Sequence, residues 1–472
     1  MINVLHVSAE CSPFVKVGGL ADVIGSLPNE IKRLKNSDVR VVLPFYKSIP
    51  KKYQDKAEDL FNFNIDFDEG YVGVKTLKKG NILYYFIDSQ YYFGSRDNIY
   101  NYGDEGKRYT YFQLAVLGMI ERLDFLVNII HVHDWHTAMI PLIIKKKYQD
   151  MKIKSVLSLH NLQYQGIFPL QDFQLFGINY DTRFEYDGHL NFLKAGIVSA
   201  DIITTVSPNY AQEILTDYYG YGMQNLLKMR GSDVIGILNG IDYKEFSPEK
   251  DSFIQKKFSI DNYKEGKLEN KKYLFKELKI DFDIDKPLIS IISRLVNQKG
   301  IDLVQRVFEE MLGIDNFNFI ILGSGEDVYE EYFKDLEMKF SNKVKTYIGY
   351  SNKLAHMIYA SSDIFLMPSK FEPCGLGQII ALKYGTIPVV RETGGLVDTI
   401  EAYNEYEKKG NGFSFTNFNA HDMMHTIRYA LQIYHNHPSD WDSLVKNAMS
   451  SDFSWNKSAK KYKEIYQELK QK

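Results

Sequence analysis

A seven-residue segment occurs twice in this chain, near its two ends. Residues 18–24 read GGLADVI and residues 394–400 read GGLVDTI, so five of the seven positions are identical. Each copy follows a short apolar run and precedes a helix-like stretch, an order typical of strand, glycine turn and helix. Such a turn brings backbone N–H groups and the positive end of a helix dipole to one place, which suits a phosphate.

The matched pair predicts two similar α/β halves that face each other across a shared diphosphate ligand. The alternative is that both copies are ordinary turns between a strand and a helix, in which glycine only supplies a positive φ.

Length and composition limit the class of protein. With 472 residues, of which 44% are hydrophobic and 25% charged, the chain is too long for one core and predicts two or three domains. A net charge of −3 gives no basic surface, so we expect no nucleic-acid partner. The two cysteines, Cys11 and Cys374, provide neither a disulfide framework nor a zinc quartet.

The start of the chain resembles no secretory leader, and no stretch approaches the ~20 apolar residues that span a bilayer. We therefore expect a cytoplasmic protein with no membrane partner. The sequence carries no signal for an oligomeric state.

Apolar runs alternate with helical patterns along the whole chain. In the first half we expect strands at 39–43, 82–87, 129–132, 154–159, 202–206 and 234–237, and helices at 20–34, 107–123, 137–148 and 209–215. In the second half we expect a charged helical stretch within 250–278, and strands at 288–292, 318–322, 344–348, 364–367 and 387–390, each of the later strands followed by a helix. This alternation predicts parallel sheets, with a domain boundary near Gly240.

Polar residues follow several of the predicted strands in the first half. Lys16 precedes the first glycine pair and adds a point charge there. The run HVHDWH at 131–136 is similar to a zinc pattern of binuclear hydrolases, but its aspartate is displaced by one position and no clear set of further ligands follows. We therefore expect no metal. His160, with Asn161, ends the next strand, where a histidine is either a structural hydrogen-bonding group or part of the site.

In the second half, Arg294 ends one strand and Lys299 precedes the next helix. Arginine can donate two hydrogen bonds to phosphate oxygens, and lysine acts as a point charge. The alternative is that Arg294 and Lys299 are ordinary surface residues next to the start of a helix. Glu372 stands just before a glycine turn, where a carboxylate can accept sugar hydroxyls. The turn at 323–325 lacks the third glycine of a dinucleotide fingerprint, and the aspartates at 281–285 read as solvated linker residues.

Taken together, these segments resemble the bacterial glycogen synthases and plant starch synthases, which are two-domain glycosyltransferases of the GT-B architecture. The resemblance runs nearly end to end. It is carried by KVGGLADV at 16–23, HDWH at 133–136, HNLQYQG at 160–166, FLKAG at 192–196, VSP at 206–208, LNGID at 238–242, SRL at 293–295, QKG at 298–300, SKFEPCGL at 369–376, TGGLVD at 393–398 and DFSW at 452–455.

The resemblance implies two Rossmann-like doubly wound domains that face each other across a cleft. Residues 1–240 would form the acceptor-side domain and residues 241–450 the domain that binds the nucleotide-sugar donor. Residues 451–472 would cross back and pack on the first domain.

The implied reaction is transfer of glucose from ADP-glucose to the non-reducing end of an α-1,4-glucan such as glycogen, without a cofactor. Arg294 and Lys299 would clamp the diphosphate, His160 and Glu372 would hold glucosyl hydroxyls, and Asp134 would lie near the reacting centre. Tyr350 would stack on the base. The remaining substrate-binding positions would be Lys16, Gly18, Gly19, Asn161, Asn239, Cys374, Gly375, Leu376, Thr393, Gly394 and Gly395.

One segment departs from the family pattern. Where relatives usually have D-N-x-x-R-[FY], residues 104–109 read DEGKRY, which changes what we expect of the glucan acceptor site. Two alternatives stay open: another GT-B enzyme, such as a sucrose-type synthase or a nucleotide-sugar epimerase, and a catalytically silent glucan-binding protein.

Overall fold

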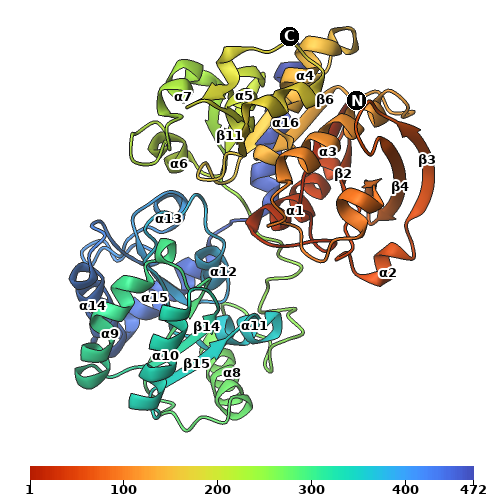
Figure 1. Cartoon of the computed structure of the whole chain (residues 1–472). Helices are drawn as coiled ribbons and strands as arrows, with labels where there is room; N and C mark the ends of the chain where they lie inside the picture. Colours follow the sequence, from red (N-terminus) through yellow and green to blue (C-terminus); the bar gives the residue numbers. More distant parts are fainter. Residues whose placement is uncertain (472) are drawn as a thin grey trace. The chain divides into compact units, whose positions relative to one another are not determined.

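The computed structural model describes residues 1–471, which divide into two compact units (Figure 1). Unit 1 is Met1–Gly240 together with the C-terminal segment from Trp455 onwards, and unit 2 is Ile241–Ser454. Figure 1 draws unit 2 in green to blue, while the last helix, in dark blue, lies within unit 1.

Among the helices of residues 1–471, none is both long enough and apolar enough to cross a membrane.

Unit 1 is built on a nine-stranded sheet with the strand order β12-β11-β7-β6-β1-β2-β5-β4-β3. All the neighbouring pairs from β12 to β5 are parallel. The strands are β1 (Ile2–Val7), β2 (Ser37–Pro44), β3 (Glu58–Asn64), β4 (Tyr71–Lys79), β5 (Ile82–Asp88), β6 (Ile129–His133), β7 (Lys154–Leu159), β11 (Ile202–Thr205) and β12 (Val234–Gly236). The central strands β1, β6 and β7 are almost wholly buried, which is why apolar residues dominate them in the sequence apart from a few polar ones such as His6 and His131.

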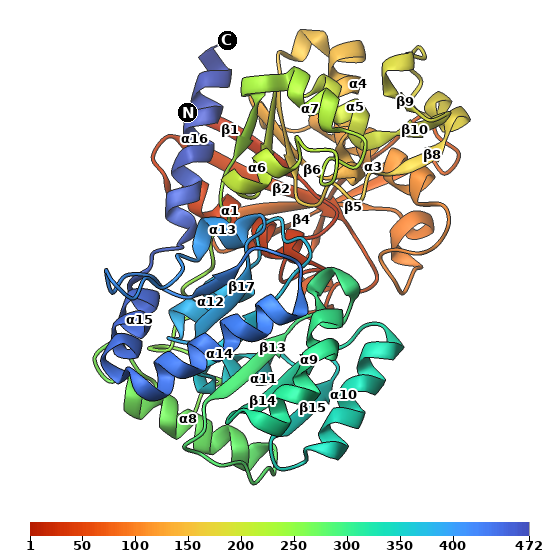
Figure 2. The ribbon, with the colours of Figure 1, turned by 90° about the vertical axis from the view of Figure 1, so that its left-hand side faces the viewer.

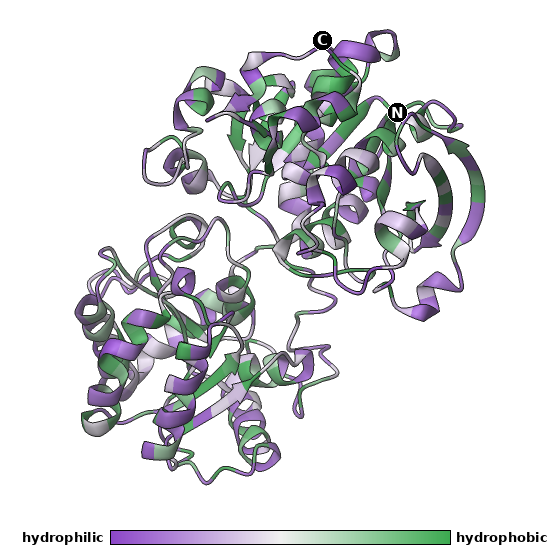
Figure 3. Cartoon of the chain, viewed as in Figure 1, coloured by the Kyte–Doolittle hydropathy of each residue, from purple (hydrophilic) through white to green (hydrophobic). Residues whose placement is uncertain are grey.

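The edge of this sheet corrects the expectation of purely parallel sheets. Strand β4 pairs antiparallel with both β5 and β3, so the sheet is mixed. Hydrophobic and hydrophilic residues alternate along β3 and β4 (Figure 3), and the residues of β3 are mostly exposed. An antiparallel edge that faces water on one side has this alternating pattern, so a search for continuous apolar runs did not detect it.

Unit 1 also contains a small antiparallel sheet with the order β8-β10-β9, which was not predicted. Its strands are only two or three residues long: β8 (Ile167–Pro169), β9 (Glu185–Tyr186) and β10 (His189–Asn191). Strands this short contain too few residues to show a period.

Helices cover the larger sheet of unit 1, and the last helix of the chain is one of them. They are α1 (Gly19–Arg33), α2 (Lys51–Gln54), α3 (Glu105–Ile120), α4 (Ile140–Lys147), α5 (Phe192–Ser199), α6 (Pro208–Glu213), α7 (Gln224–Arg230) and α16 (Trp455–Gln471). Helix α16 contacts α1, β1 and β6, and Figure 2 shows it beside β1 and α1. The predicted helix at 137–148 begins later, at Ile140, because residues 135–137 form a short 3-10 turn.

Unit 2 is built on a six-stranded sheet, all parallel, with the order β15-β14-β13-β16-β17-β18. The strands are β13 (Leu288–Ile292), β14 (Asn318–Gly323), β15 (Val344–Ile348), β16 (Ile364–Met367), β17 (Ile387–Arg391) and β18 (Phe413–Phe415). Five of these six strands match predicted ones, and the three-residue β18 was missed.

The helices of unit 2 bury apolar stripes against this sheet. They are α8 (Tyr263–Glu277), α9 (Ile301–Ile314), α10 (Asp327–Lys339), α11 (Asn352–Ser361), α12 (Gly377–Lys383), α13 (Gly395–Thr399), α14 (Ala420–Asn436) and α15 (Pro438–Ser450). In α9 the buried side chains recur every three or four residues: Ile301, Val304, Val307, Phe308 and Met311. The charged stretch at 250–278 is helical only from Tyr263.

Candidate active site

In each unit the strand order reverses direction at one place, between β1 and β6 in unit 1 and between β13 and β16 in unit 2. Open α/β sheets bind ligands beyond the carboxyl ends of the strands at such a point. The loops that leave there are 8–18, 134–139, 293–300 and 368–376. They contain nine of the predicted residues: Lys16, Gly18, Asp134, Arg294, Lys299, Glu372, Cys374, Gly375 and Leu376.

The loop after β1 is held by Glu10, a buried residue. Its carboxylate accepts the N–H groups of Val17 at 2.7 Å and Gly18 at 3.0 Å, and the hydroxyl of Tyr100 at 2.7 Å. This loop occupies residues 8–18, so the first motif is not the tight turn that the sequence predicted.

Gly18 and Gly19 are not required by the conformation of the chain. Neither has a positive φ, and no atom of residues 1–471 lies within 4 Å of the place where a Cβ would stand on either residue. Within residues 1–471 the N–H of Gly19, at the start of α1, has no acceptor. The positive-φ explanation therefore fails for this copy, and the open space is suited to the close approach of an anionic ligand.

Lys16 lies beside this space but is already paired. Its Nζ is 2.7 Å from a carboxylate oxygen of Asp22 on α1, and both side chains are partly exposed. The predicted point charge is therefore present, with a carboxylate next to it.

Asp134 has an unusual backbone at the end of β6. Its φ of 53° and ψ of −172° are values that side chains other than glycine seldom adopt, and such strain is concentrated at functional sites. Its Oδ1 accepts the backbone N–H of His160 at 2.7 Å, and the N–H of Asn161 also points to this carboxylate. Burial raises the pKa of Asp134 to about 7 despite these bonds. Asp134 therefore ties the end of β6 to the end of β7 and places His160.

His160 continues into a row of hydrogen-bonded histidines on neighbouring strands. Its Nε2 lies 3.0 Å from Nδ1 of His133, and Nε2 of His133 lies 3.0 Å from Nδ1 of His6. Burial lowers the pKa of His160 and of His6 to about 3, and that of His133 well below its usual value. All three are therefore neutral near pH 7.

His6, His133 and the adjacent His131 also form a group whose ring nitrogens could hold a metal ion, with one ligand atom from each within 4.8 Å of the others. Hydrogen bonds already engage most of these nitrogens. His131 contacts Tyr466 Oη at 2.6 Å and Ser158 Oγ at 2.7 Å, and His6 and His133 contact each other. These hydrogen bonds account for the contacts within the cluster, and the absence of a metal stays a prediction.

In unit 2, Lys299 and Glu372 form a largely buried ion pair with an N–O distance of 2.5 Å. Ser369 Oγ donates to the same carboxylate oxygen of Glu372 at 3.1 Å. The structure thus brings two predicted residues together from loops that lie far apart in sequence.

The second glycine motif is packed, in contrast to the first. Gly394 has a φ of +46°, and a Cβ there would lie 2.0 Å from the carbonyl oxygen of Glu372. A Cβ on Gly395 would lie 2.2 Å from the carbonyl oxygen of Cys374. The N–H of Gly395 already donates to the carbonyl of Glu372 at 3.1 Å. This turn therefore packs against the loop that carries Glu372, and its contact with the donor diphosphate stays a prediction.

Arg294 and Tyr350 are exposed at the carboxyl ends of β13 and β15. Arg294 donates to Gln298 Oε1 at 3.2 Å, and Tyr350, 75% exposed, contacts Asn352 Oδ1 at 3.4 Å. Within the described residues neither side chain contacts a carboxylate, and neither is buried, so both can contact a ligand.

The other predicted residues differ in their surroundings. Asn161 Oδ1 accepts the N–H of Gln163 at 3.0 Å, and Asn239 is buried with no partner for its Oδ1 in the described part of the chain. Cys374 is buried, Leu376 is partly buried, and Gly375 has a φ of +72° next to Gln378.

Comparison with known proteins identifies the family. Residues 3–229 match the model described as starch synthase catalytic domain, and residues 275–447 match the one described as glycosyl transferases group 1. A glycogen synthase of Bacillus cereus (strain B4264) is 47% identical over 479 residues, which cover 99% of this chain and 100% of that protein. One from Bacillus subtilis (strain 168) is 46% identical, covering 99% and 98% of the two chains. The chain belongs to the glycogen synthase family.

Solved structures agree with this family and with the fold. The catalytic domain of starch synthase IV from Arabidopsis thaliana, bound to ADP and acarbose, matches with a TM-score of 0.90 and 32% identity over 100% of both chains. This confirms the predicted GT-B class. A sucrose-phosphate synthase from Thermosynechococcus elongatus matches with a TM-score of 0.63 and 14% identity over 99% of each chain, which shows the fold alone.

The segment that departs from the family pattern lies at the start of α3. Arg108 is fully buried and donates to the carbonyls of Tyr92 at 3.0 Å and Ile99 at 2.9 Å, and Asp104 pairs with Arg96. In this chain these residues hold the 90–104 loop in place.

Sequence reasoning missed three residues that shape the site: Glu10, His6 and His133. His6 stands inside an apolar run, and this polar residue in a buried strand was the available signal. His133 was considered as a metal ligand and as part of the HDWH segment, but not as a partner of His160, since that contact depends on the pairing of β6 with β7. Glu10 has no signal beyond its place between β1 and the first motif.

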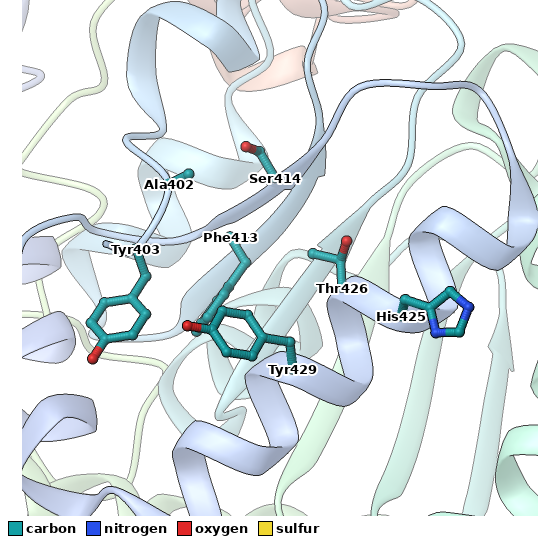
Figure 4. Close-up of a pocket in the computed structure, with 7 residues that line it drawn as sticks. All are labelled: Ala402, Tyr403, Phe413, Ser414, His425, Thr426 and Tyr429. Carbon is teal, nitrogen blue, oxygen red and sulfur yellow. The ribbon is translucent and has the colours of Figure 1, made fainter. Parts of the chain in front are cut away.

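A separate pocket of about 270 Å³ lies in unit 2 beside β18 and α14 (Figure 4). It is lined by Ala402, Tyr403, Phe413, Ser414, His425, Thr426 and Tyr429. None of these residues belongs to the predicted site.

Proposed function

We propose that this protein transfers glucose from ADP-glucose to the non-reducing end of an α-1,4-glucan such as glycogen, with retention of configuration. The observation that carries the proposal is the 47% identity to a glycogen synthase over 99% of this chain. The ADP in the related starch synthase structure supports the choice of donor, since ADP is the leaving group of ADP-glucose.

In this proposal unit 2 binds the donor. Negative charge grows on the diphosphate as the glycosidic bond breaks, and fixed cations aimed at that charge stabilise the transition state. Arg294 and Lys299 supply these cations, Tyr350 stacks on the base, and Cys374, Gly375 and Leu376 line the donor site. Glu372 accepts glucosyl hydroxyls, and its ion pair with Lys299 holds both side chains in position before the donor arrives. The turn at Thr393, Gly394 and Gly395 helps these cations to hold the diphosphate.

Unit 1 supplies the acceptor side and a second contact with the donor phosphates. The open N–H of Gly19, with Gly18 and Lys16, approaches the diphosphate. His160 holds a glucosyl hydroxyl, and Asn161 and Asn239 complete the substrate contacts.

Retention without a covalent intermediate fits the carboxylates of this chain. A double displacement needs a free carboxylate nucleophile. Asp134 is engaged by the backbone of His160, and Glu372 is paired with Lys299. We therefore propose same-face attack, in which the departing phosphate helps to take the proton of the acceptor hydroxyl.

A donor panel tests the proposal. ADP-glucose, UDP-glucose and GDP-mannose are each supplied with glycogen, and incorporation of labelled sugar is measured. We expect the highest kcat/KM with ADP-glucose. A substantially higher value with UDP-glucose would reverse the choice of donor, and glucan binding by calorimetry without any turnover would indicate a silent binding protein. Transfer to fructose in place of glycogen would indicate a sucrose-type enzyme.

The stereochemical part has its own test. The protein is incubated with a slow fluorinated ADP-glucose and examined by intact-mass spectrometry. We expect no glucosyl adduct, and an adduct mapped to Asp134 or Glu372 would replace this mechanism with a double displacement.

A further inference from the structure

His160 uses one ring nitrogen inside the protein and leaves the other for a ligand. Its Nε2 contacts His133, while Nδ1 has no partner within residues 1–471 and the side chain is partly exposed. Whether Nδ1 carries a proton decides whether His160 donates a hydrogen bond to a substrate or accepts one.

The histidine row (His6, His133 and His160) restricts this choice. A neutral imidazole has one N–H, and each of the two contacts in the row needs one proton between its nitrogens. Only two arrangements satisfy both contacts. In the first, His6 donates to His133 and His133 donates to His160, so that all three rings carry the proton on Nδ1. In the second, every bond is reversed and all three protons lie on Nε2.

The buried end of the row distinguishes the two arrangements. His6 is fully buried, and its Nε2 has no hydrogen-bond partner within residues 1–471. The reversed arrangement would place an N–H on that nitrogen, without an acceptor. Buried unpaired N–H donors are rarer in proteins than under-satisfied acceptors, so the first arrangement is favoured.

We propose that His6 and His133 are positioning residues that hold His160 as its Nδ1–H tautomer, so that it donates a hydrogen bond to a hydroxyl oxygen of the donor sugar. The ligand assignment rests on the proposed function, whereas the tautomer does not. In a free neutral histidine either ring nitrogen can carry the proton. The histidine row therefore fixes which nitrogen of His160 is the donor, as well as the orientation of its ring.

Packing around the row keeps the three rings in register. His131 stacks on His133 with ring centroids 4.2 Å apart and lies 4.6 Å from His6. Its own hydrogen bonds run elsewhere, to Tyr466 on α16 and to Ser158. Tyr466→Phe is therefore a matched control that alters a bond next to the row and none within it.

The first measurement is direct. The full-length protein is labelled with ¹⁵N-histidine, and long-range ¹H–¹⁵N correlation spectra at pH 7.5 distinguish protonated from bare ring nitrogens. His160→Gln, His133→Asn and His6→Asn assign the signals. We expect all three residues as Nδ1–H tautomers. A row of Nε2–H tautomers, or stoichiometric zinc bound to the purified protein through these rings, would overturn the proposal. This result does not depend on which sugar the enzyme uses.

The second measurement is kinetic. His133→Leu removes the donor to His160, and we expect kcat to fall about 10- to 100-fold through misplacement of His160, with a smaller change in KM. His133→Asn keeps a side-chain N–H at the position of Nδ1 and is expected to recover most of that loss, while Tyr466→Phe keeps the wild-type kcat. Equal losses in the Leu and Asn variants would reduce His133 to a packing role and contradict the proposal. If His133→Leu does not fold, the NMR measurement of the tautomers in the wild-type protein tests the proposal by itself.

Discussion

The two copies of the glycine motif have nearly the same sequence and quite different surroundings. In unit 1, a Cβ on Gly18 or Gly19 would meet no atom within 4 Å. In unit 2, a Cβ on Gly394 or Gly395 would lie 2.0 or 2.2 Å from a carbonyl oxygen of the 372–374 segment. The first pair leaves space for something outside the chain, and the second pair lets two loops of the chain approach each other.

This difference extends to the cations near each motif. Lys16 is half exposed and shares its charge with Asp22, whereas Lys299 is largely buried and bound to Glu372. The same short sequence therefore leaves open space in unit 1 and packs two loops together in unit 2. Each of the following predictions tests one part of that contrast.

The largest expected difference between the units appears in acid. Unit 1 holds five histidines whose pKa burial lowers below 6.5: His6, His131, His133, His136 and His160. Below pH 6.5 the unfolded state of unit 1 therefore binds more protons than the folded state. Each histidine costs the fold about 1.4 kcal/mol per pH unit until its own folded pKa is reached. We expect unit 1 to unfold before unit 2 as the pH falls from 6.5 towards 4.

Two other groups bear on this comparison. Asp134 acts in the opposite direction, because its folded pKa of about 7 lets the folded state bind that proton first, but it is one group against five. Within residues 241–454 the one buried histidine, His356, contacts the Asp251 carboxylate at 2.7 Å. Hydrogen exchange read by mass spectrometry at decreasing pH compares peptides from β1 and β6 with peptides from β13 and β16. Earlier loss of protection in unit 2 would contradict the expectation.

The second-largest effect is expected when one of the two cations proposed to bind the diphosphate, Arg294 or Lys299, is removed. Lys299→Ala is expected to lower kcat roughly 10²–10³-fold at saturating donor, since it deletes a fixed stabiliser of the developing charge. It is also expected to lower the free energy of unfolding, because the largely buried Glu372 carboxylate loses its partner. Arg294→Ala should cause a similar loss of kcat with no loss of stability, because Arg294 is exposed.

Steady-state kinetics and thermal unfolding of the same preparations separate these effects. Lys345→Ala is the control, since Lys345 pairs with Glu337 at 2.7 Å in the same unit and lies outside the loops of the site. A near-native kcat in either clamp variant would make that residue a surface group.

The contrast also shows where sequence reasoning reaches its limit. Continuous apolar runs gave the buried parallel strands nearly residue by residue, because a strand buried on both faces leaves a strong local signal. The strand ends then indicated where Asp134, His160, Arg294 and Glu372 would lie. What each glycine touches depends on contacts between segments far apart in sequence, so two copies that agree at five of seven positions gave one prediction for two different environments. The histidine row could not be predicted from the sequence for the same reason, because its members come from three different strands or strand ends.

Adding a methyl group at Gly395 tests whether the second glycine motif lets its turn approach the 372–374 segment closely. Gly395→Ala would place a Cβ against the carbonyl oxygen of Cys374, and overpacking of this kind costs about 1–3 kcal/mol. We expect a lower melting temperature of unit 2 and a lower kcat, because the loop that carries Glu372 is displaced. Gly313→Ala is the matched control: it lies in α9, has no atom within 4 Å of its Cβ, and should be neutral or stabilising. An unchanged melting temperature in Gly395→Ala would mean that the two loops can separate freely.

The smallest effect is expected at the open motif, where the same substitution should affect binding and leave stability unchanged. Gly19 starts α1 with an ordinary backbone and empty space at its Cβ position, so Gly19→Ala fits the fold. The added methyl would instead stand where a phosphate oxygen approaches the N–H, and loss of one charge-assisted hydrogen bond corresponds to about a tenfold rise in KM for ADP-glucose. Calorimetric titration with ADP reports the same loss without turnover, and Gly313→Ala again serves as the control. An unchanged KM together with an unchanged affinity for ADP would remove the first motif from the donor site.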